Sequence, residues 1–313
     1  MLKINGVNNL KHVLEPTVIT MGNFDGIHLG HQELIHQCQM LAAMRKHRSL
    51  VMSFYPHPVK ILRPEIKHKR LFPIQDLEEQ LRLYEVDILN VEPFTKALAD
   101  LSADEFFEKI LINKLNMQAL VVGFDFHFGK NKTGDISTLT RLCKKHNIEL
   151  VVVPQQSEKA GIKISSSSIR ESLKSGDVHH AWSLLGRPFY NYGEVKKGRQ
   201  LGRTIGVPTA NVLDDECVIP QKGVYLTRST LKGETYPSIT NVGVAPTVTD
   251  EEILVIESHL LSDIKDSFYG QFIKVEYLEP VREEKKFNSI DELVKQIHTD
   301  IEWAKRRHQE MGL

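Results

Sequence analysis

The sequence predicts an α/β protein with two domains: a Rossmann-like domain, followed by a small antiparallel β-barrel that ends in a helix. Over the first 155 residues, strand-like apolar runs alternate with helical patterns, which indicates a parallel sheet covered by helices. From residue 189 to 281 the helical pattern is replaced by short β-type runs separated by Gly and Pro, which is typical of a small barrel. The length of 313 residues is sufficient for two domains of ordinary size.

The elements of the first domain follow from two periodicities. Apolar runs predict strands at residues 17–21, 50–54, 86–91, 119–122 and 150–153. Apolar positions on one helical face predict helices after Gly30 and at residues 76–84, 102–115 and 135–146. Because strands and helices alternate, the strands are expected to lie parallel in one sheet.

The boundary between the domains is predicted near residue 185. A helix is expected around Ser168, which has capping-box spacing to Glu171, and it is expected to end at Gly176. A second helix is expected to end at Gly186, before the first barrel strand. The predicted domains are residues 1–185 and 186–313, and the last helix is predicted over residues 289–308.

Composition limits the classes of function. Lys plus Arg and Asp plus Glu both number 40, and this balance argues against a nucleic-acid partner. No apolar run is long enough to span a membrane, and the N-terminus lacks the apolar stretch of a signal peptide. The three cysteines have no metal-binding or disulfide spacing, so a reducing cytoplasm is expected. We expect a monomer or a weak homo-oligomer with no membrane partner.

The polar motifs of the first domain follow the ends of its predicted strands. They are GNFDGIHLGH at residues 22–31, YPHP at 55–58, GFDFHFG at 123–129 and ISS at 164–166. Because ligands of open α/β sheets bind beyond the carboxyl ends of the strands, these loops are expected to form one binding site.

His28 and His31 stand three residues apart at the start of a predicted helix, so their side chains can lie on one face. A helix N-terminus favours anions, and Gly26 and Gly30 let the backbone approach a phosphate closely. The two imidazoles can hydrogen-bond nucleotide phosphates and stabilise the charge that builds up on leaving pyrophosphate. The alternative is that two loop histidines are merely solvated.

The motifs GNFDGIHLGH and ISSSSIR resemble the two signatures of the nucleotidyltransferase superfamily. Together with FYPHP and GFDFHFG, they closely resemble the FMN adenylyltransferase module of bacterial bifunctional riboflavin kinase/FAD synthetases. The resemblance implies an ATP and phosphate site at Gly22, Asn23, Phe24, Gly26, Gly30, Ser165, Ser166 and Arg170, and a flavin site at His57, Asp125 and Phe126. His127 stands where this family usually has Arg, and Ser167-Ser168 where it has Thr-Arg, so we expect altered affinity rather than lost activity.

The reaction that this resemblance implies needs no nucleophilic side chain. The phosphate of FMN attacks the α-phosphorus of ATP in line, and pyrophosphate leaves. Catalysis then consists mainly of positioning and charge stabilisation. Mg²⁺ is expected as the cofactor, held largely by phosphate oxygens and water.

The second domain has a different candidate phosphate site, since the sequence contains neither GxxxxGK[ST] nor GxGxxG. Residues 193–211 combine glycines with four basic side chains, namely Lys196, Lys197, Arg199 and Arg203. A flexible, basic, Gly-rich loop can close over phosphates, and Thr209 and Asn211 offer oxygen ligands for Mg²⁺. The alternative is an exposed basic hairpin.

This segment resembles the riboflavin kinase signature GRxxGFPTAN, and GVY, NVGVAPT, IESHLL and REEKKF resemble further motifs of that family in order. The resemblance implies that Gly198 and Arg203 contact ATP. It also implies that Glu257 is the general base, which takes a proton from the 5′-hydroxyl of riboflavin as that hydroxyl attacks the γ-phosphorus. Val207, Ala245 and Ser258 depart from the family pattern, and LLSDIKDSFYG stands where the family has LLDFxxDLYG.

The sequence therefore predicts a bifunctional enzyme that uses ATP to convert riboflavin into FMN and FMN into FAD. The first alternative is a monofunctional FMN adenylyltransferase whose kinase domain has decayed into a flavin-binding module, as the changes at Ala245 and Ser258 suggest. The second is a flavin-responsive regulator that binds RNA through the basic residues 196–203, against which the zero net charge weighs.

Overall fold

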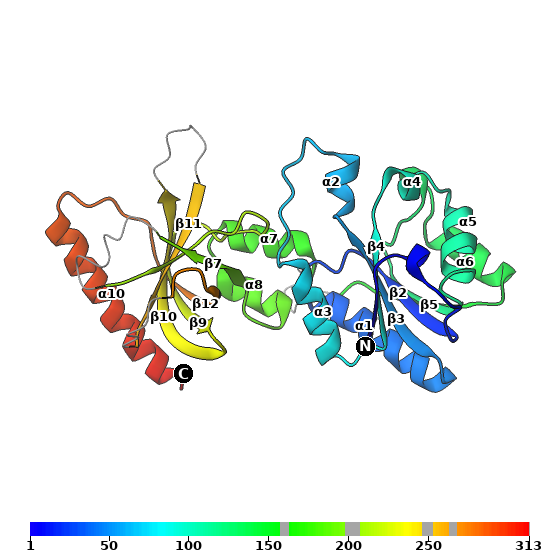
Figure 1. The fold of residues 1–313 in the computed structure, drawn as a ribbon, viewed down its shortest axis with the longest axis horizontal. Coiled ribbons are helices and arrows are strands. Elements are labelled where there is room, and N and C mark those ends of the chain that lie inside the picture. The colour runs from blue at the N-terminus through cyan, green and yellow to red at the C-terminus, as the bar shows by residue number, and fades with distance from the viewer. Residues whose placement is uncertain (157–162, 198–206, 246–252, 263–267, 313) are drawn as a thin grey trace. The chain divides into compact units, whose positions relative to one another are not determined.

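The computed structural model describes residues 1–156, 163–197, 207–245, 253–262 and 268–312. They form two compact units (Figure 1). The first unit is Met1–His68 with Ile74–Ser165, and the second is Lys69–Pro73 with Ser166–Leu313.

The first unit is built on a six-stranded parallel sheet with the order β1-β4-β3-β2-β5-β6. The strands are β1 Leu2–Ile4, β2 Thr17–Met21, β3 Arg48–Tyr55, β4 Ile88–Pro93, β5 Met117–Gly123 and β6 Glu149–Val153. All five strands predicted from the sequence are present. β1 was not predicted, because three residues are too short to show a periodicity.

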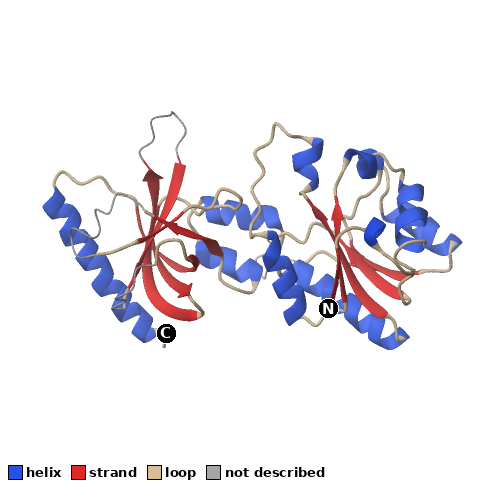
Figure 2. Ribbon diagram, in the orientation of Figure 1, coloured by secondary structure: helices blue, strands red, loops and turns tan. Residues whose placement is uncertain are grey.

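Helices cover both faces of this sheet (Figure 2). On one face, α1 (Leu29–Arg45) and α3 (Ile74–Leu83) pack against Val18, Val51 and Val121. On the other, the π-helical segment η2 (Phe106–Ile112) and α6 (Ile136–Lys145) pack against Ile19, Leu50 and Leu120. Adjacent residues of each strand thus enter different cores, as expected for a sheet buried on both sides. The remaining helical elements of this unit are η1 Val7–Asn9, α2 Pro58–Leu62, α4 Lys96–Ala99, α5 Ala103–Glu105 and η3 Lys130–Lys132.

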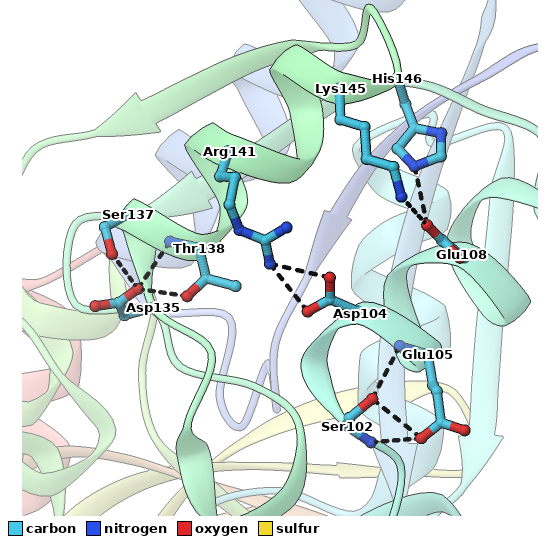
Figure 3. Close-up of polar contacts among 10 residues, drawn as sticks. All are labelled: Ser102, Asp104, Glu105, Glu108, Asp135, Ser137, Thr138, Arg141, Lys145 and His146. Atoms are coloured by element: carbon cyan, nitrogen blue, oxygen red, sulfur yellow. Dashed lines mark hydrogen bonds and ion pairs between the residues drawn. The ribbon is translucent and has the colours of Figure 1, made fainter.

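Charged side chains join α6 to α5 and η2 (Figure 3). Arg141 donates to both carboxylate oxygens of Asp104 at 3.0 Å, and Lys145 donates to Glu108 at 2.7 Å. Asp135 caps α6 by accepting a hydrogen bond from the backbone N–H of Thr138. This bond, followed by those from the hydroxyls of Ser137 and Thr138, lowers the pKa of the Asp135 carboxyl to about 2. Such exposed pairs add little energy each, so the buried core carries most of the stability of this layer.

The second unit begins with two helices and continues as a closed barrel with the strand order β10-β11-β8-β7-β12-β9. Its elements are α7 Ser166–Lys174, α8 Val178–Leu185, β7 Tyr190–Lys196, β8 Ala210–Val212, β9 Gly223–Leu231, β10 Glu234–Ala245, β11 Ile253–Leu260, β12 Phe272–Glu283 and α10 Ile290–Glu310. The predicted barrel and last helix are confirmed. The capping box at Ser168 and Glu171 was wrong, because α7 already begins at Ser166 and Ser168 lies inside it.

A short segment from the first half of the sequence belongs to the second unit. The carbonyl of Arg70 accepts from the N–H of Val218 at 2.8 Å, and the ring of Phe72 lies 5.2 Å from that of Phe189. Phe72 is fully buried there. The second unit therefore includes residues 69–73, α7 and α8 beside the barrel, and the predicted boundary at residue 185 stays a prediction.

The helix α10 packs on the outside of the barrel through Ile301 and Ala304. Val207, one of the departures from the riboflavin kinase pattern, is buried in the same cluster. An aliphatic residue is therefore accommodated there as an ordinary core residue. Across the described residues, no helix combines the length and apolar character that crossing a membrane requires.

Candidate active sites

The first unit contains a cavity of about 770 Å³ at the carboxyl edge of its sheet. Segments that follow or end β2, β3, β4, β5 and β6 all contribute to its lining. β2 pairs with both β3 and β5, so the strand order reverses there, where open α/β sheets bind ligands. The residues predicted from the sequence that line the cavity are Gly22, Asn23, Phe24, His28, Gly30, His31, Asp125, Phe126 and Ser165.

The two histidines lie together at the start of α1. His28 is the N-cap, and its Nδ1 accepts a hydrogen bond from the backbone N–H of His31 at 3.3 Å. The two rings stack with centroids 3.6 Å apart. The prediction that both side chains share one face of the helix is therefore confirmed.

Burial keeps both imidazoles neutral. It lowers the pKa of His28 to about 4, against an opposing attraction from Asp25, and burial together with repulsion from His28 lowers the pKa of His31 well below its usual value. Because Nδ1 of His28 is an acceptor, its proton is on Nε2, which can donate to an anion. The pair thus offers neutral N–H donors beside a helix N-terminus, where anions are favoured.

This burial predicts a loss of stability in acid. The unfolded chain protonates His28 below about pH 6.5, whereas the folded chain resists protonation down to about pH 4. In this window the unfolded state binds more protons, so the free energy of unfolding falls as pH falls, by about 2 kcal/mol between pH 6.5 and 5.

We expect His28→Asn, which keeps a polar cap but does not titrate, to lose less stability than the parent over this range. Hydrogen exchange of the β2 amides at pH 7 and 5 measures the stability of the first unit. Tryptophan fluorescence does not report on this unit, because both tryptophans, Trp182 and Trp303, lie in the second. An equal loss in parent and variant would refute the assignment.

The loop between β2 and α1 has an unusual backbone. Gly26 has φ +96°, and the non-glycine residues Phe24 and Ile27 have φ +44° and +42°. Both of these side chains are buried, which holds them in a conformation that L-residues rarely adopt. A Cβ on Gly30 would lie 3.3 Å from the His28 ring, so this glycine leaves room for the imidazole.

The sequence missed part of the cavity lining. Phe54 and Phe94, at the ends of β3 and β4, form an edge-to-face pair with centroids 5.8 Å apart. Lys163 makes an ion pair of 2.5 Å with Asp125 and lies 5.2 Å from the Phe124 ring. The available signal for the two aromatic residues was their position at the carboxyl end of a parallel strand. Nothing in the sequence pairs Lys163 with a residue 38 positions away.

Four predicted residues are not among the lining residues. Gly26 serves the turn described above, and His57 caps α2 through a hydrogen bond of 3.2 Å from the N–H of Val59. Ser166 and Arg170 belong to α7 of the second unit, where Arg170 donates to the Ser166 carbonyl at 3.0 Å. Their roles at the nucleotide and flavin stay predictions.

The second unit brings three predicted residues into one row across the barrel. Lys196 of β7 pairs with Asn211 of β8, which pairs with Glu257 of β11. Directly paired antiparallel residues project to the same face with Cβ atoms about 5 Å apart. Glu257 in turn pairs with Asn241 of β10, which the sequence had not singled out.

Thr209 precedes this row by two residues and is half-buried like Asn211. In extended chain, residues two apart face the same side, so both oxygens can serve one ion. Nδ1 of His259 donates to the Pro208 carbonyl at 2.8 Å, which fixes the segment before Thr209. Burial lowers the pKa of His259, so it is neutral at pH 7. The predicted contacts Gly198 and Arg203 lie outside the described residues.

Oxygen ligands of this kind fit Mg²⁺. Within the described part of the chain, no cluster of three or more His, Cys, Asp or Glu could hold a metal. The donors present, a hydroxyl and an amide, suit an ion that takes most of its ligands from phosphate and water.

Ser258, the most conspicuous departure from the kinase pattern, completes a buried ring of hydroxyl groups inside the barrel. Its Oγ lies 3.0 Å from the hydroxyls of Ser229 and Thr240. Contacts of 2.7–2.8 Å through Thr227 and Ser238 close the ring. All five side chains are fully buried, and a closed ring lets each hydroxyl donate once and accept once. The serine is therefore compatible with an intact barrel.

We expect Ser258→Val to destabilise the barrel by about 1–3 kcal/mol, because it leaves one buried donor and one buried acceptor unpaired. Denaturant unfolding followed by tryptophan fluorescence measures this, since both tryptophans lie in the second unit. Thr235→Val, at an exposed position of β10, is the matched control. A midpoint unchanged from the parent in Ser258→Val would show that the ring contributes no stability.

Comparisons with known proteins identify a family for each half of the chain. The FAD synthetase family model matches residues 10–168, and the riboflavin kinase family model matches residues 185–308. The chain belongs to the bifunctional riboflavin kinase/FMN adenylyltransferase family.

Relatives of that name match nearly the whole chain. The Haemophilus influenzae enzyme is 36% identical, covering 97% of this chain and 98% of its own. The Bacillus subtilis enzyme is 37% identical, covering 95% and 94%. The crystal structure of a protein named macrolide-efflux protein from Streptococcus pneumoniae is 32% identical, with a TM-score of 0.87 over 97% of this chain and 98% of that one. The comparisons support the expectation of two activities over that of a decayed kinase domain.

Proposed function

We propose that the two units carry out successive steps of flavin cofactor synthesis. The second unit transfers the γ-phosphoryl group of ATP to riboflavin, giving FMN and ADP. The first unit transfers the adenylyl group of a second ATP to FMN, giving FAD and pyrophosphate. The observation that carries the proposal is that each unit contains its own group of functional side chains: the stacked pair His28 and His31 in one, and the row of Asn211 and Glu257 in the other.

In the first unit, adenylyl transfer is a matter of position and charge. The FMN phosphate attacks the α-phosphorus, and negative charge grows on the departing pyrophosphate. We propose that the N–H of His28 and the N-terminus of α1 stabilise that charge, since preorganised donors act most strongly in a site that excludes water. The aromatic side chains Phe54, Phe94 and Phe126 give the cavity flat apolar surfaces that suit a flavin ring.

In the second unit, the nucleophile is a neutral alcohol. We propose that the carboxylate of Glu257 accepts the proton of this alcohol as the alcohol oxygen attacks the γ-phosphorus. Asn211 and Thr209 would hold Mg²⁺, which when bound neutralises phosphate charge. Lys196 places a positive charge at the end of the same row, where phosphates arrive.

We also propose a cytoplasmic location and action as a monomer or a weak homo-oligomer without nucleic acid. The three cysteines, Cys38, Cys143 and Cys217, are all buried free thiols, which supports a reducing compartment.

Chromatography of the products from riboflavin, ATP and Mg²⁺ tests the proposal directly. We expect FMN to appear first and FAD to follow, with ADP and pyrophosphate as by-products. Supplied FMN should give FAD without riboflavin. A preparation that makes FAD from FMN but no FMN from riboflavin would restore the decayed-kinase alternative.

A further inference from the structure

We propose that Asn241 is a positioning residue for Glu257 in the phosphorylation of riboflavin. Gly243, which has no side chain, leaves the space that the amide of Asn241 requires. This inference rests on the proposed role of Glu257 as the base. Neither Asn241 nor Gly243 was expected to act in the reaction.

Asn241 stands directly opposite Glu257 in the ladder between β10 and β11. Its Nδ2 donates to Oε2 of Glu257 at 3.4 Å, and both side chains are half-buried. Among the described residues, no hydrogen bond reaches the other carboxylate oxygen, Oε1. One oxygen is thus held by the neighbouring strand, and the other stays available to a substrate hydroxyl.

The backbone beneath this pair is fixed from inside the barrel. Thr240 and Ser258, the residues next to Asn241 and Glu257, are joined by a hydroxyl–hydroxyl bond of 3.0 Å. Because side chains alternate between the two faces of a strand, this internal bond sets the spacing of the pair outside.

Gly243 lies two residues beyond Asn241, on the same face. A Cβ at this position would lie 3.1 Å from Nδ2 of Asn241 and 3.5 Å from Oε1 of Glu284. The first distance is tighter than ordinary contact, so any side chain here would displace the amide. The φ angle of Gly243 is not positive, so the backbone conformation at this position does not require a glycine.

The chemistry follows from the direction of this hydrogen bond. The Asn241 amide donates to one carboxylate oxygen of Glu257 and leaves the lone pairs of the other oxygen open to a proton from the substrate. It also restricts the rotamers of a glutamate that would otherwise rotate in solvent, and misplacement of a reacting group is costly. Ionisable side chains on the neighbouring elements include Lys196 and Arg282 in the same row of paired residues, His259 two residues further along β11, and Glu284 beside Gly243.

The test compares variants of the full chain in both reactions. We expect Asn241→Ala to lower kcat for FMN formation by about 10-fold or more, the effect of losing a hydrogen bond to a charged group, with little change in KM for riboflavin. Gly243→Ala should lower the same kcat while Asn241 is intact. Thr235→Ala, at an exposed position of the same strand, should match the parent, and all variants should make FAD from supplied FMN at the parent rate.

A pH profile separates positioning from mere folding. Asn241→Asp puts a second carboxylate beside Glu257, which disfavours its ionised form, so the acid limb of the kcat profile should move to higher pH. Damage to the fold alone would lower kcat without moving that limb. An unmoved limb together with an unchanged kcat in Asn241→Ala overturns the inference. If Glu257→Gln itself retains full activity, the proposed base is wrong instead.

Discussion

Glu257→Gln should abolish the phosphorylation of riboflavin and leave the adenylylation of supplied FMN nearly intact. The substitution keeps the size of the side chain and its capacity for hydrogen bonds, so the pairing of β11 with β8 and β10 should persist. It removes the ability to accept a proton, and the ribityl hydroxyl is a poor nucleophile while it keeps one. Loss of a general base commonly costs about 100- to 10,000-fold in rate.

The selectivity of this effect is as informative as its size. The second reaction uses an FMN phosphate that is already ionised and needs no base. Both half-reactions should be measured on one preparation, with circular dichroism as a check of folding. Glu234→Gln, at an exposed position of β10, is the matched control. FMN formation at the parent rate in Glu257→Gln would show that Glu257 is only a solvated strand residue.

His28→Ala and His31→Ala should have the opposite selectivity. Each should lower FAD formation by about 100- to 1,000-fold, the usual cost of losing one donor to developing charge, while FMN still accumulates. The stacked rings share one hydrogen-bonded cap, so the double variant should lose less than the product of the two single effects.

Turnover from supplied FMN, measured as FAD and as released pyrophosphate, checks this expectation. His12→Ala, in which an exposed histidine of the same unit is removed, should match the parent. Unchanged FAD yield in both His28→Ala and His31→Ala would remove these residues from the mechanism.

Much of the first site followed from local pattern. The motif at residues 22–31 comes directly after an apolar strand, and the structure places it at the carboxyl edge, where nine of the predicted residues line one cavity. The pattern failed where the signal was ambiguous. Four serines in succession offer several N-caps, so α7 was expected to begin near Ser168, although it begins at Ser166. His57 caps α2 through its Nδ1, and its assignment to the flavin stays a prediction.

By itself, the sequence determined the α/β class of the first unit, the barrel of the second and the motifs that indicate the two activities. Periodicity, turn residues and short motifs are local properties of a chain, so they can be read without the structure. Only the tertiary structure decided which residues meet. Glu257 faces Asn211 and Asn241 through the register of three strands, and Ser258 closes a ring of hydroxyls drawn from three strands. Register and ring closure depend on hydrogen bonds between segments far apart in the chain, and no local pattern encodes such partners.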